Sequence, residues 1–229
     1  RVVDELVTLA QRHGTTTFTA ADNILRRDAY TTLLPRLAGL GLDLRLFYEI
    51  KANVRRDEIA ALAHAGVRWI LPGIESFSDR VLEEMRKGTT AVQNVAVLKW
   101  AREFGLTVFY NIITGFPHET DDDYEAMYAL LPSLSHLDAP SRGYGNDHLG
   151  EVHRFSPFFD DAERLGIRTV RAHRGYRRLI PPRILKGEEY GYYFERDLPR
   201  DAASRRQAQR LERLREAGRE STEVREGDA

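Results

Sequence analysis

The chain has 229 residues, a formal net charge of −1 and 42% hydrophobic residues, enough for one domain with a sizeable core and a tail. The near-neutral charge gives no general indication of nucleic-acid or membrane-surface binding, and no apolar run approaches the roughly 20 residues of a membrane span. Because cysteine is absent, the sequence excludes disulfides and thiolate metal sites. No secretion signal is visible, and we predict a cytoplasmic location.

The first residues already follow helical spacing, with apolar side chains at Val2, Val3, Leu6 and Leu9. This pattern predicts a helix over 2–13 that ends at the following glycine. Since the chain opens on Arg1 within this pattern, we expect that it starts inside a domain and that an upstream segment is missing.

Strands and helices are predicted to alternate along the next 150 residues. Apolar and β-branched runs predict strands over 15–19, 44–50, 67–71, 106–113 and 151–155. Periodic patterns predict helices over 30–40, 57–65, 78–86, 90–104, after Thr120, and over 160–165. A capping box of Thr90 and Gln93 opens one of them, and three aspartates follow Thr120 where a helix N-terminus favours acids.

The alternation indicates an α/β fold, with a parallel sheet that curls toward a barrel. About five strands are too few for a closed eight-stranded barrel, so residues 1–166 are predicted to form a partial barrel whose first strand is missing. Residues 167–229 are predicted to form an irregular C-terminal extension. Within it, a helix over 200–219 is expected to be solvated and loosely attached, because Leu211 and Leu214 are nearly its only large apolar residues. The last ten residues are expected to be disordered.

Polar residues and glycines recur just beyond the strands. They are Asp22 and Asn23; Glu49, Lys51 and Asn53; Gly73, Glu75 and Ser76; Asn111, Gly115, Phe116, Pro117 and Glu119; and Arg154 and Ser156. One such residue is ordinary in a turn, but a set at every strand exit predicts a shared ligand site at one mouth of the barrel.

The residue types favour a small zwitterionic nucleoside as the ligand. Carboxylates at Glu75 and Glu119 suit an amino group or ribose hydroxyls, and Lys51 suits a carboxylate. Gly73 and Gly115 let the backbone approach a flat ring, and the phenylalanine and proline that follow Gly115 offer it an apolar edge. There is no glycine-rich phosphate loop, no histidine spacing typical of a metal site and no nucleophile elbow.

Two segments carry a family resemblance. Pro72-Gly-Ile-Glu-Ser76 followed by Met85-Arg-Lys-Gly88, and Ile113-Thr-Gly-Phe-Pro-His-Glu-Thr120, resemble the radical S-adenosylmethionine (radical SAM) superfamily. The sequence is most similar to its cobalamin-binding branch and to the C-methyltransferase-like proteins that mature ribosomally made peptides. Segments 21–25, 49–53, 98–103 and 154–157 look like that subfamily.

The resemblance implies a partial (β/α)6 TIM-like barrel. It also implies S-adenosylmethionine (SAM), which is cleaved at a [4Fe–4S] cluster to give a radical that abstracts hydrogen. Glu75 and Ser76 would contact the ribose or amino-acid end of SAM, Lys51 its carboxylate, and Gly115 and the next two residues its adenine. The implied cofactor-binding set is Asp22, Asn23, Lys51, Glu75, Ser76, Asn111, Gly115, Phe116 and Pro117, with the first two near the substrate or the methionine end.

The sequence departs from the family pattern twice. The three cysteines that hold the cluster are absent, so its ligands, and any cobalamin domain, are expected upstream of Arg1. His118 stands where the family's turn usually has glycine, which puts the backbone path in question.

The interpretation is therefore the C-terminal part of a radical SAM enzyme that modifies a ribosomally made peptide, by C-methylation or related chemistry. By itself this chain is expected to be inactive. Three alternatives stay open. They are a cysteine-free paralogue that binds acidic leader peptides through the arginine-rich segment 168–183, an RNA-modifying radical SAM enzyme, and an unrelated barrel lyase with Lys51 as a Schiff-base residue.

Overall fold

The computed structural model describes residues 1–22, 24–116, 118–141, 147–148, 157–161, 164–165, 167–172, 192–196 and 209–218. A four-stranded sheet in the order β1-β2-β3-β4 is its centre. The strands are β1 (Thr17–Thr19), β2 (Arg45–Ile50), β3 (Val67–Pro72) and β4 (Thr107–Val108), and every neighbouring pair is parallel. The predicted parallel α/β sheet is confirmed.

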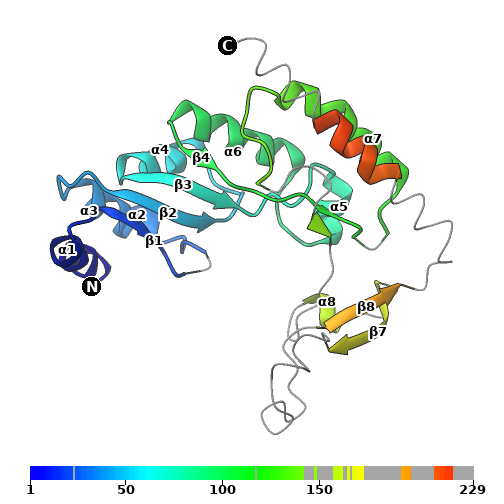
Figure 1. Ribbon diagram of the computed structural model, residues 1–229, viewed down its shortest axis with the longest axis horizontal. Helices are drawn as coiled ribbons and strands as arrows, with labels where there is room; N and C mark the ends of the chain where they lie inside the picture. The colour runs from blue at the N-terminus through cyan, green and yellow to red at the C-terminus, as the bar shows by residue number, and fades with distance from the viewer. Residues whose placement is uncertain are drawn as a thin grey trace, which may run out of the picture.

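The helices before and between these strands follow the predicted alternation. They are α1 (Val2–His13), α2 (Ala29–Thr32), α3 (Leu34–Ala38), α4 (Arg56–His64), α5 (Asp79–Glu84), α6 (Ala91–Glu103) and α7 (Asp121–Leu130), which a 3-10 turn over Leu131–Leu134 extends. In Figure 1, α4 and α6 run along one side of the sheet.

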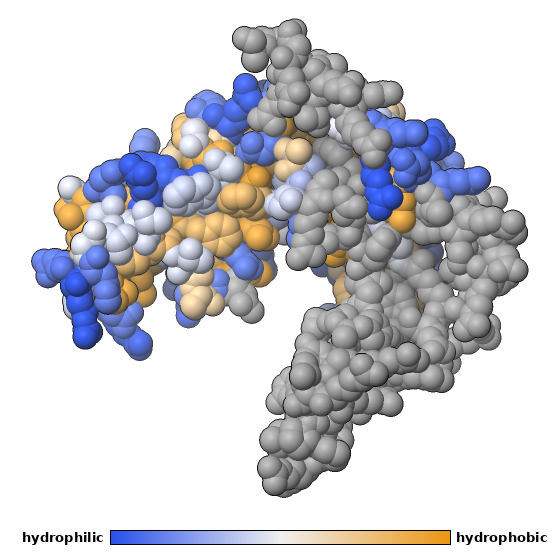
Figure 2. All heavy atoms as spheres, viewed as in Figure 1, coloured by the Kyte–Doolittle hydropathy of each residue, from blue (hydrophilic) through white to orange (hydrophobic). Residues whose placement is uncertain are grey.

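The core lies between this helical layer and alternate residues of the strands. Leu46 and Ile70 from the sheet are fully buried, as are Ile59 of α4 and Val97 of α6. The opposite sheet face is only half-buried, with Phe109 38% exposed. Figure 2 shows apolar residues gathered over the sheet. Burial of the sheet face that packs against α4 and α6 supplies the hydrophobic driving force for folding. The loops extend from the ends of the strands.

The helix predicted over 30–40 is broken into α2 and α3 at Leu33. Pro35 explains the break, because proline has no backbone N–H and its ring collides with the carbonyl four residues earlier. The chain continues in a nearly helical course, since the Leu37 N–H donates to the Leu33 carbonyl at 3.0 Å.

The strand predicted over 106–113 is also divided, into β4 and β5 (Ile113–Thr114), and β5 pairs in parallel with β6 (Asp147–His148). The division occurs because β3, the strand that pairs with β4, ends at Pro72, and the chain then turns at Gly73. The Tyr110 carbonyl consequently accepts from the Ser141 N–H at 2.8 Å, and pairing resumes only where the Ile113 N–H reaches the Glu75 carbonyl at 2.9 Å.

The C-terminal segments differ from the irregular extension that the sequence predicts. β7 (Ile167–Ala172) and β8 (Tyr192–Arg196) form an antiparallel pair, and α8 spans Pro157–Asp160 rather than 160–165. The strand expected over 151–155 and the expected disordered tail lie outside the described residues. The boundary between domains at residue 166 stays a prediction.

The prediction of a loosely attached C-terminal helix is wrong. A helix over residues 209–218 lies beside α7 in Figure 1, and its Leu214 is fully buried in the main core. Arg210 pairs with Asp121 at 2.6 Å and Arg213 pairs with Glu125. Two leucines suffice because the tyrosines of α7 also face this helix, and the guanidinium groups of Arg210 and Arg213 lie over the rings of Tyr124 and Tyr128.

None of the helices in the described part of the chain combines the length and hydrophobicity that crossing a bilayer requires.

Candidate functional site

The loops after the strands lie at one edge of the sheet, as expected for parallel strands in register. Backbone hydrogen bonds bind each exit loop to the neighbouring strand. The Leu25 N–H donates to the Glu49 carbonyl at 2.8 Å, and the Gly73 N–H donates to the Ile50 carbonyl at 3.2 Å. This is the edge at which open α/β sheets bind ligands.

The loop after β3 holds Glu75 in an uncommon backbone conformation. Its φ is +60°, and the Ser76 N–H donates to the Ile74 carbonyl at 2.7 Å, so Glu75 is the centre of a three-residue γ-turn. With a positive φ this turn is rare and strained. A non-glycine residue held in this region of φ costs on the order of 1–3 kcal/mol and persists only when its surroundings enforce it.

The side chain of Glu75 forms an ion pair with Lys87, which follows α5. The distance from the Lys87 Nζ to the Glu75 Oε1 is 3.1 Å. The Lys87 side chain is 30% exposed and the Glu75 side chain 23%. A Cβ atom at Gly73 would lie 3.1 Å from the Lys87 Nζ, so the glycine leaves the room that the lysine occupies. The pair offers a donor and an acceptor side by side, with solvent access to both.

Asn94, on α6, is a residue that sequence reasoning missed. Its Nδ2 donates to the carbonyls of Ile74 at 3.0 Å and Ser76 at 2.9 Å, the two residues that flank Glu75. The signal was present in the sequence, because Asn94 shares the buried stripe of α6 with Val97, Leu98 and Ala101. A polar residue on such a stripe needs hydrogen-bond partners.

The second exit loop, after β5, is closed by a carboxylate. Gly115 has a φ of +76°, and its N–H donates to Oε2 of Glu119 at 2.8 Å and to the Tyr124 hydroxyl at 3.3 Å. The Tyr124 hydroxyl also donates to Glu119. Glu119 therefore stabilises this turn by accepting hydrogen bonds from the Gly115 N–H and the Tyr124 hydroxyl. The sequence had suggested only a ligand contact for this residue.

A buried carboxylate joins the two loops. Asp123, in the first turn of α7, accepts from the Ser78 hydroxyl at 2.7 Å, from the Thr120 N–H at 2.8 Å and from Arg80. Arg80 in turn donates to the His118 carbonyl at 2.7 Å. Burial by itself would raise the pKa of Asp123, but the hydrogen bonds from Arg80, Ser78 and Thr120 outweigh burial and hold this pKa well below its usual range.

His118 adopts a backbone conformation that glycine favours, with a φ of +64°. Its Nδ1 lies 3.4 Å from Oε1 of Glu84, which Arg164 also contacts at 2.8 Å. The backbone path thus resembles that of a glycine turn, and the imidazole is accommodated by an acidic neighbour.

Replacing His118 tests the left-handed conformation. We expect His118→Gly to change the free energy of unfolding by less than about 1 kcal/mol, because relief of strain offsets the added freedom of the unfolded chain. His118→Val should lose about 1–2 kcal/mol, since β-branched residues tolerate a positive φ least. Urea unfolding measures both, and a Val variant as stable as the Gly variant would contradict the assignment.

The remaining predicted site residues occupy different environments. The Ser76 hydroxyl is buried and accepts from the Ser78 N–H at 3.1 Å. Phe116 packs in a small core with Val81 and Met85. Lys51 is exposed and Asn111 half-buried. Asn23, Pro117, Arg154 and Ser156 lie outside the described residues. Predicted ligand contacts of these side chains stay predictions.

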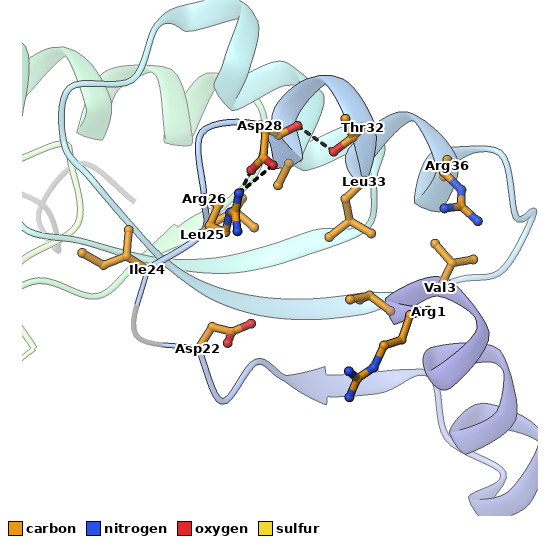
Figure 3. A pocket seen from close by; sticks show the side chains of 12 residues that line it. Arg1, Val3, Asp22, Ile24, Leu25, Arg26, Asp28, Thr32, Leu33 and Arg36 are labelled. Atoms are coloured by element: carbon orange, nitrogen blue, oxygen red, sulfur yellow. Dashed lines mark hydrogen bonds and ion pairs between the residues drawn. The ribbon is translucent and has the colours of Figure 1, made fainter.

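Asp22 lines a groove beside the sheet edge (Figure 3). The groove has a volume of about 530 Å³ and is bounded by Arg1, Val3, Ile24, Leu25 and the α2–α3 segment. Neither Glu75 nor Lys87 lines it. Among the described residues, no group of three or more His, Asp or Glu side chains is arranged to hold a metal ion.

Comparison with known proteins decides the family. The model of the radical SAM superfamily matches residues 1–131, which is more than half of the sequence. The chain belongs to the radical SAM superfamily. An uncharacterised methyltransferase of Pyrococcus horikoshii is 32% identical over 137 residues, which cover 58% of this chain and 30% of that protein. A putative methylthiotransferase of Methanocaldococcus jannaschii is 30% identical over 113 residues, 48% of this chain and 25% of that protein.

Solved structures confirm the fold. The radical SAM methyltransferase TsrM from Kitasatospora setae matches 92% of this chain and 45% of its own with a TM-score of 0.62 at 19% identity. The cobalamin-dependent radical enzyme OxsB matches 61% of this chain and 22% of its own, with a TM-score of 0.50 at 18% identity. The likeness is one of fold, and it supports the predicted TIM-like α/β barrel class. This radical SAM chain spans less than a third of the curated relatives named above.

The superfamily uses SAM and a [4Fe–4S] cluster. This chain has polar groups suited to SAM but no ligands for the cluster. The sequence has no cysteine, so it supplies none of the thiolates that hold such clusters. SAM is a zwitterion with ribose hydroxyls. The adjacent carboxylate and ammonium groups of Glu75 and Lys87 match its polar groups.

Proposed function

We propose that this radical SAM chain forms part of the SAM-binding half of an enzyme that transfers a methyl or related group. The observation that carries the proposal is the pair of exit loops at the carboxyl edge of the sheet, joined through Asp123. One loop holds Glu75, which pairs with Lys87 from the segment after α5, and the other holds Gly115. Curated relatives with methyltransferase and methylthiotransferase names support it.

Bound SAM supplies the radical chemistry, and the residues of this chain bind and orient it. Glu75 is suited to accept hydrogen bonds from an ammonium or ribose hydroxyl, and Lys87 to neutralise a carboxylate. Gly73 leaves the space in which the Lys87 ammonium group lies beside Glu75. The network around Asp123 fixes the distance between the loops, which is a positioning role.

For the substrate we propose a ribosomally made peptide, modified by C-methylation, and for the complete enzyme cobalamin bound by a domain outside this sequence. The subfamily-like segments support this assignment, and the fold likeness to cobalamin-dependent enzymes is consistent with it. The cytoplasmic location stays part of the proposal.

A second candidate is modification of RNA. A tRNA-2-methylthio-N(6)-dimethylallyladenosine synthase of Acidithiobacillus ferrooxidans is 30% identical over 139 residues, 58% of this chain and 30% of that protein. Membership of the superfamily makes the unrelated barrel lyase the wrong alternative. A cysteine-free peptide-binding paralogue remains compatible with the composition.

Calorimetric titration of the chain with SAM tests the proposal. We expect binding, with Glu75→Gln and Lys87→Ala each raising Kd about tenfold, because a charge-assisted hydrogen bond contributes about 1.5–3 kcal/mol. Glu83→Gln is the control, since Glu83 is an exposed acid of α5, the helix that lies between Glu75 and Lys87 in the chain. No measurable binding to millimolar SAM, or equal loss in the control, would contradict the proposal.

A further inference from the structure

The backbone at Glu75 requires something to hold it. Its γ-turn with a φ of +60° is a conformation that a glutamate leaves unless neighbouring groups enforce it. The Ile113 N–H binds the Glu75 carbonyl at 2.9 Å, which fixes one peptide group of the turn. The Ile74 carbonyl accepts from the Ser76 N–H within the turn, and both the Ile74 and the Ser76 carbonyls accept a further hydrogen bond from outside it.

Asn94 supplies that restraint from the opposite direction. One amide group donates to both flanking carbonyls, and the side chain is fully buried. The cost of this arrangement is visible in the same side chain, because Oδ1 is buried without a hydrogen-bond partner among the described residues. A buried unsatisfied acceptor of this kind destabilises a fold, whereas an apolar residue of similar size would not.

We propose that Asn94 is a positioning residue that holds Glu75 in its left-handed conformation and thereby places the Glu75–Lys87 pair for ligand binding. This inference rests on the proposed SAM site. The hydrogen bonds of the Asn94 side chain go to the two backbone carbonyls that flank Glu75, so its effect on a ligand passes through Glu75. An asparagine is suited to this position because a single terminal amide reaches two carbonyls that lie two residues apart.

The central variant is Asn94→Leu, which keeps the number and branching of the side-chain heavy atoms and removes the donor. Leu98→Ala is the matched control, since Leu98 is buried on the same helix but does not contact the Glu75 turn through any hydrogen bond. We expect Asn94→Leu to weaken SAM binding about tenfold by calorimetry and to lower the urea midpoint, because the Ile74 and Ser76 carbonyls lose this buried donor. Leu98→Ala should lower stability and leave Kd unchanged. Asn94→Ala removes the donor without adding bulk, and it is the second variant if the leucine variant does not fold.

Two further readouts separate positioning from general damage. In a double-mutant cycle, Asn94→Leu should have a much smaller effect on Kd when Lys87 is already alanine, because the two residues act through one pair. Backbone NMR couplings at Glu75 should report a change from positive to negative φ in Asn94→Leu.

The outcomes are distinct. If the wild-type chain does not bind SAM, the proposed function fails, while the NMR couplings still decide whether Asn94 holds the turn. If SAM binds equally well to Asn94→Leu, or if Glu75 keeps a positive φ in that variant, the role of Asn94 is overturned.

Discussion

Replacing Asp123 with alanine is expected to lower the free energy of unfolding by about 2–4 kcal/mol. The substitution leaves the buried Ser78 hydroxyl and the part-buried Thr120 N–H without their acceptor, and a buried unsatisfied group costs about 1–3 kcal/mol. It also removes the partner of Arg80. That side chain is nearly half exposed, so water solvates the released charge and the loss stays below that of a fully buried ion pair.

The pH dependence of stability provides a second measurement on Asp123. Its pKa is lower in the folded chain than in the unfolded chain, so its stabilising contribution is complete above the unfolded pKa of about 3.9 and is lost as the pH falls below it. We expect Asp123→Asn to be less stable than wild type at pH 7. The difference should shrink progressively as the pH is lowered from about 5 to 2, measured by urea unfolding.

Asp122→Ala is the control for both experiments, because Asp122 is its exposed neighbour on the first turn of α7. We expect a change within about 0.5 kcal/mol. The Asp123 variants should also bind SAM more weakly than wild type, since the network joins the loops that carry Glu75 and Gly115. An Asp123→Ala chain with wild-type stability would show that this network does not hold the loops together.

The second large effect is expected at Leu214, in the helix over residues 209–218. Leu214→Ala should lower the free energy of unfolding by about 2–5 kcal/mol, the range for emptying a fully buried leucine site. Glu212→Ala, an exposed change on the same helix, should have little effect. Equal stability of the two variants would mean that the helix does not pack on α7.

This helix also reaches the candidate site indirectly. The guanidinium of Arg210 lies 5.0 Å from the ring centre of Tyr124, whose hydroxyl binds Gly115 and Glu119. The Tyr128 hydroxyl donates to the Arg210 carbonyl at 2.7 Å, and burial raises the pKa of Tyr128 to about 12. Leu214→Ala is therefore expected to weaken SAM binding as well as stability.

The sequence by itself determined the elements whose signals are local. Hydrophobic periodicity and caps located α1, α4 and α6, because a helix start or stop depends on residues within one turn. The glycine and glutamate motifs at the strand exits identified the superfamily, and the complete absence of cysteine excluded a cluster held by this chain.

Tertiary structure decided what depends on residues far apart in the chain. Asp123 meets Ser78 across 45 positions, and Asn94 meets Ile74 across 20; no local pattern specifies such partners. The inward direction of Phe116 and the burial of Leu214 were likewise set by packing. Hydrophobic burial has no direction of its own, so which apolar residue enters the core is fixed only when the elements meet.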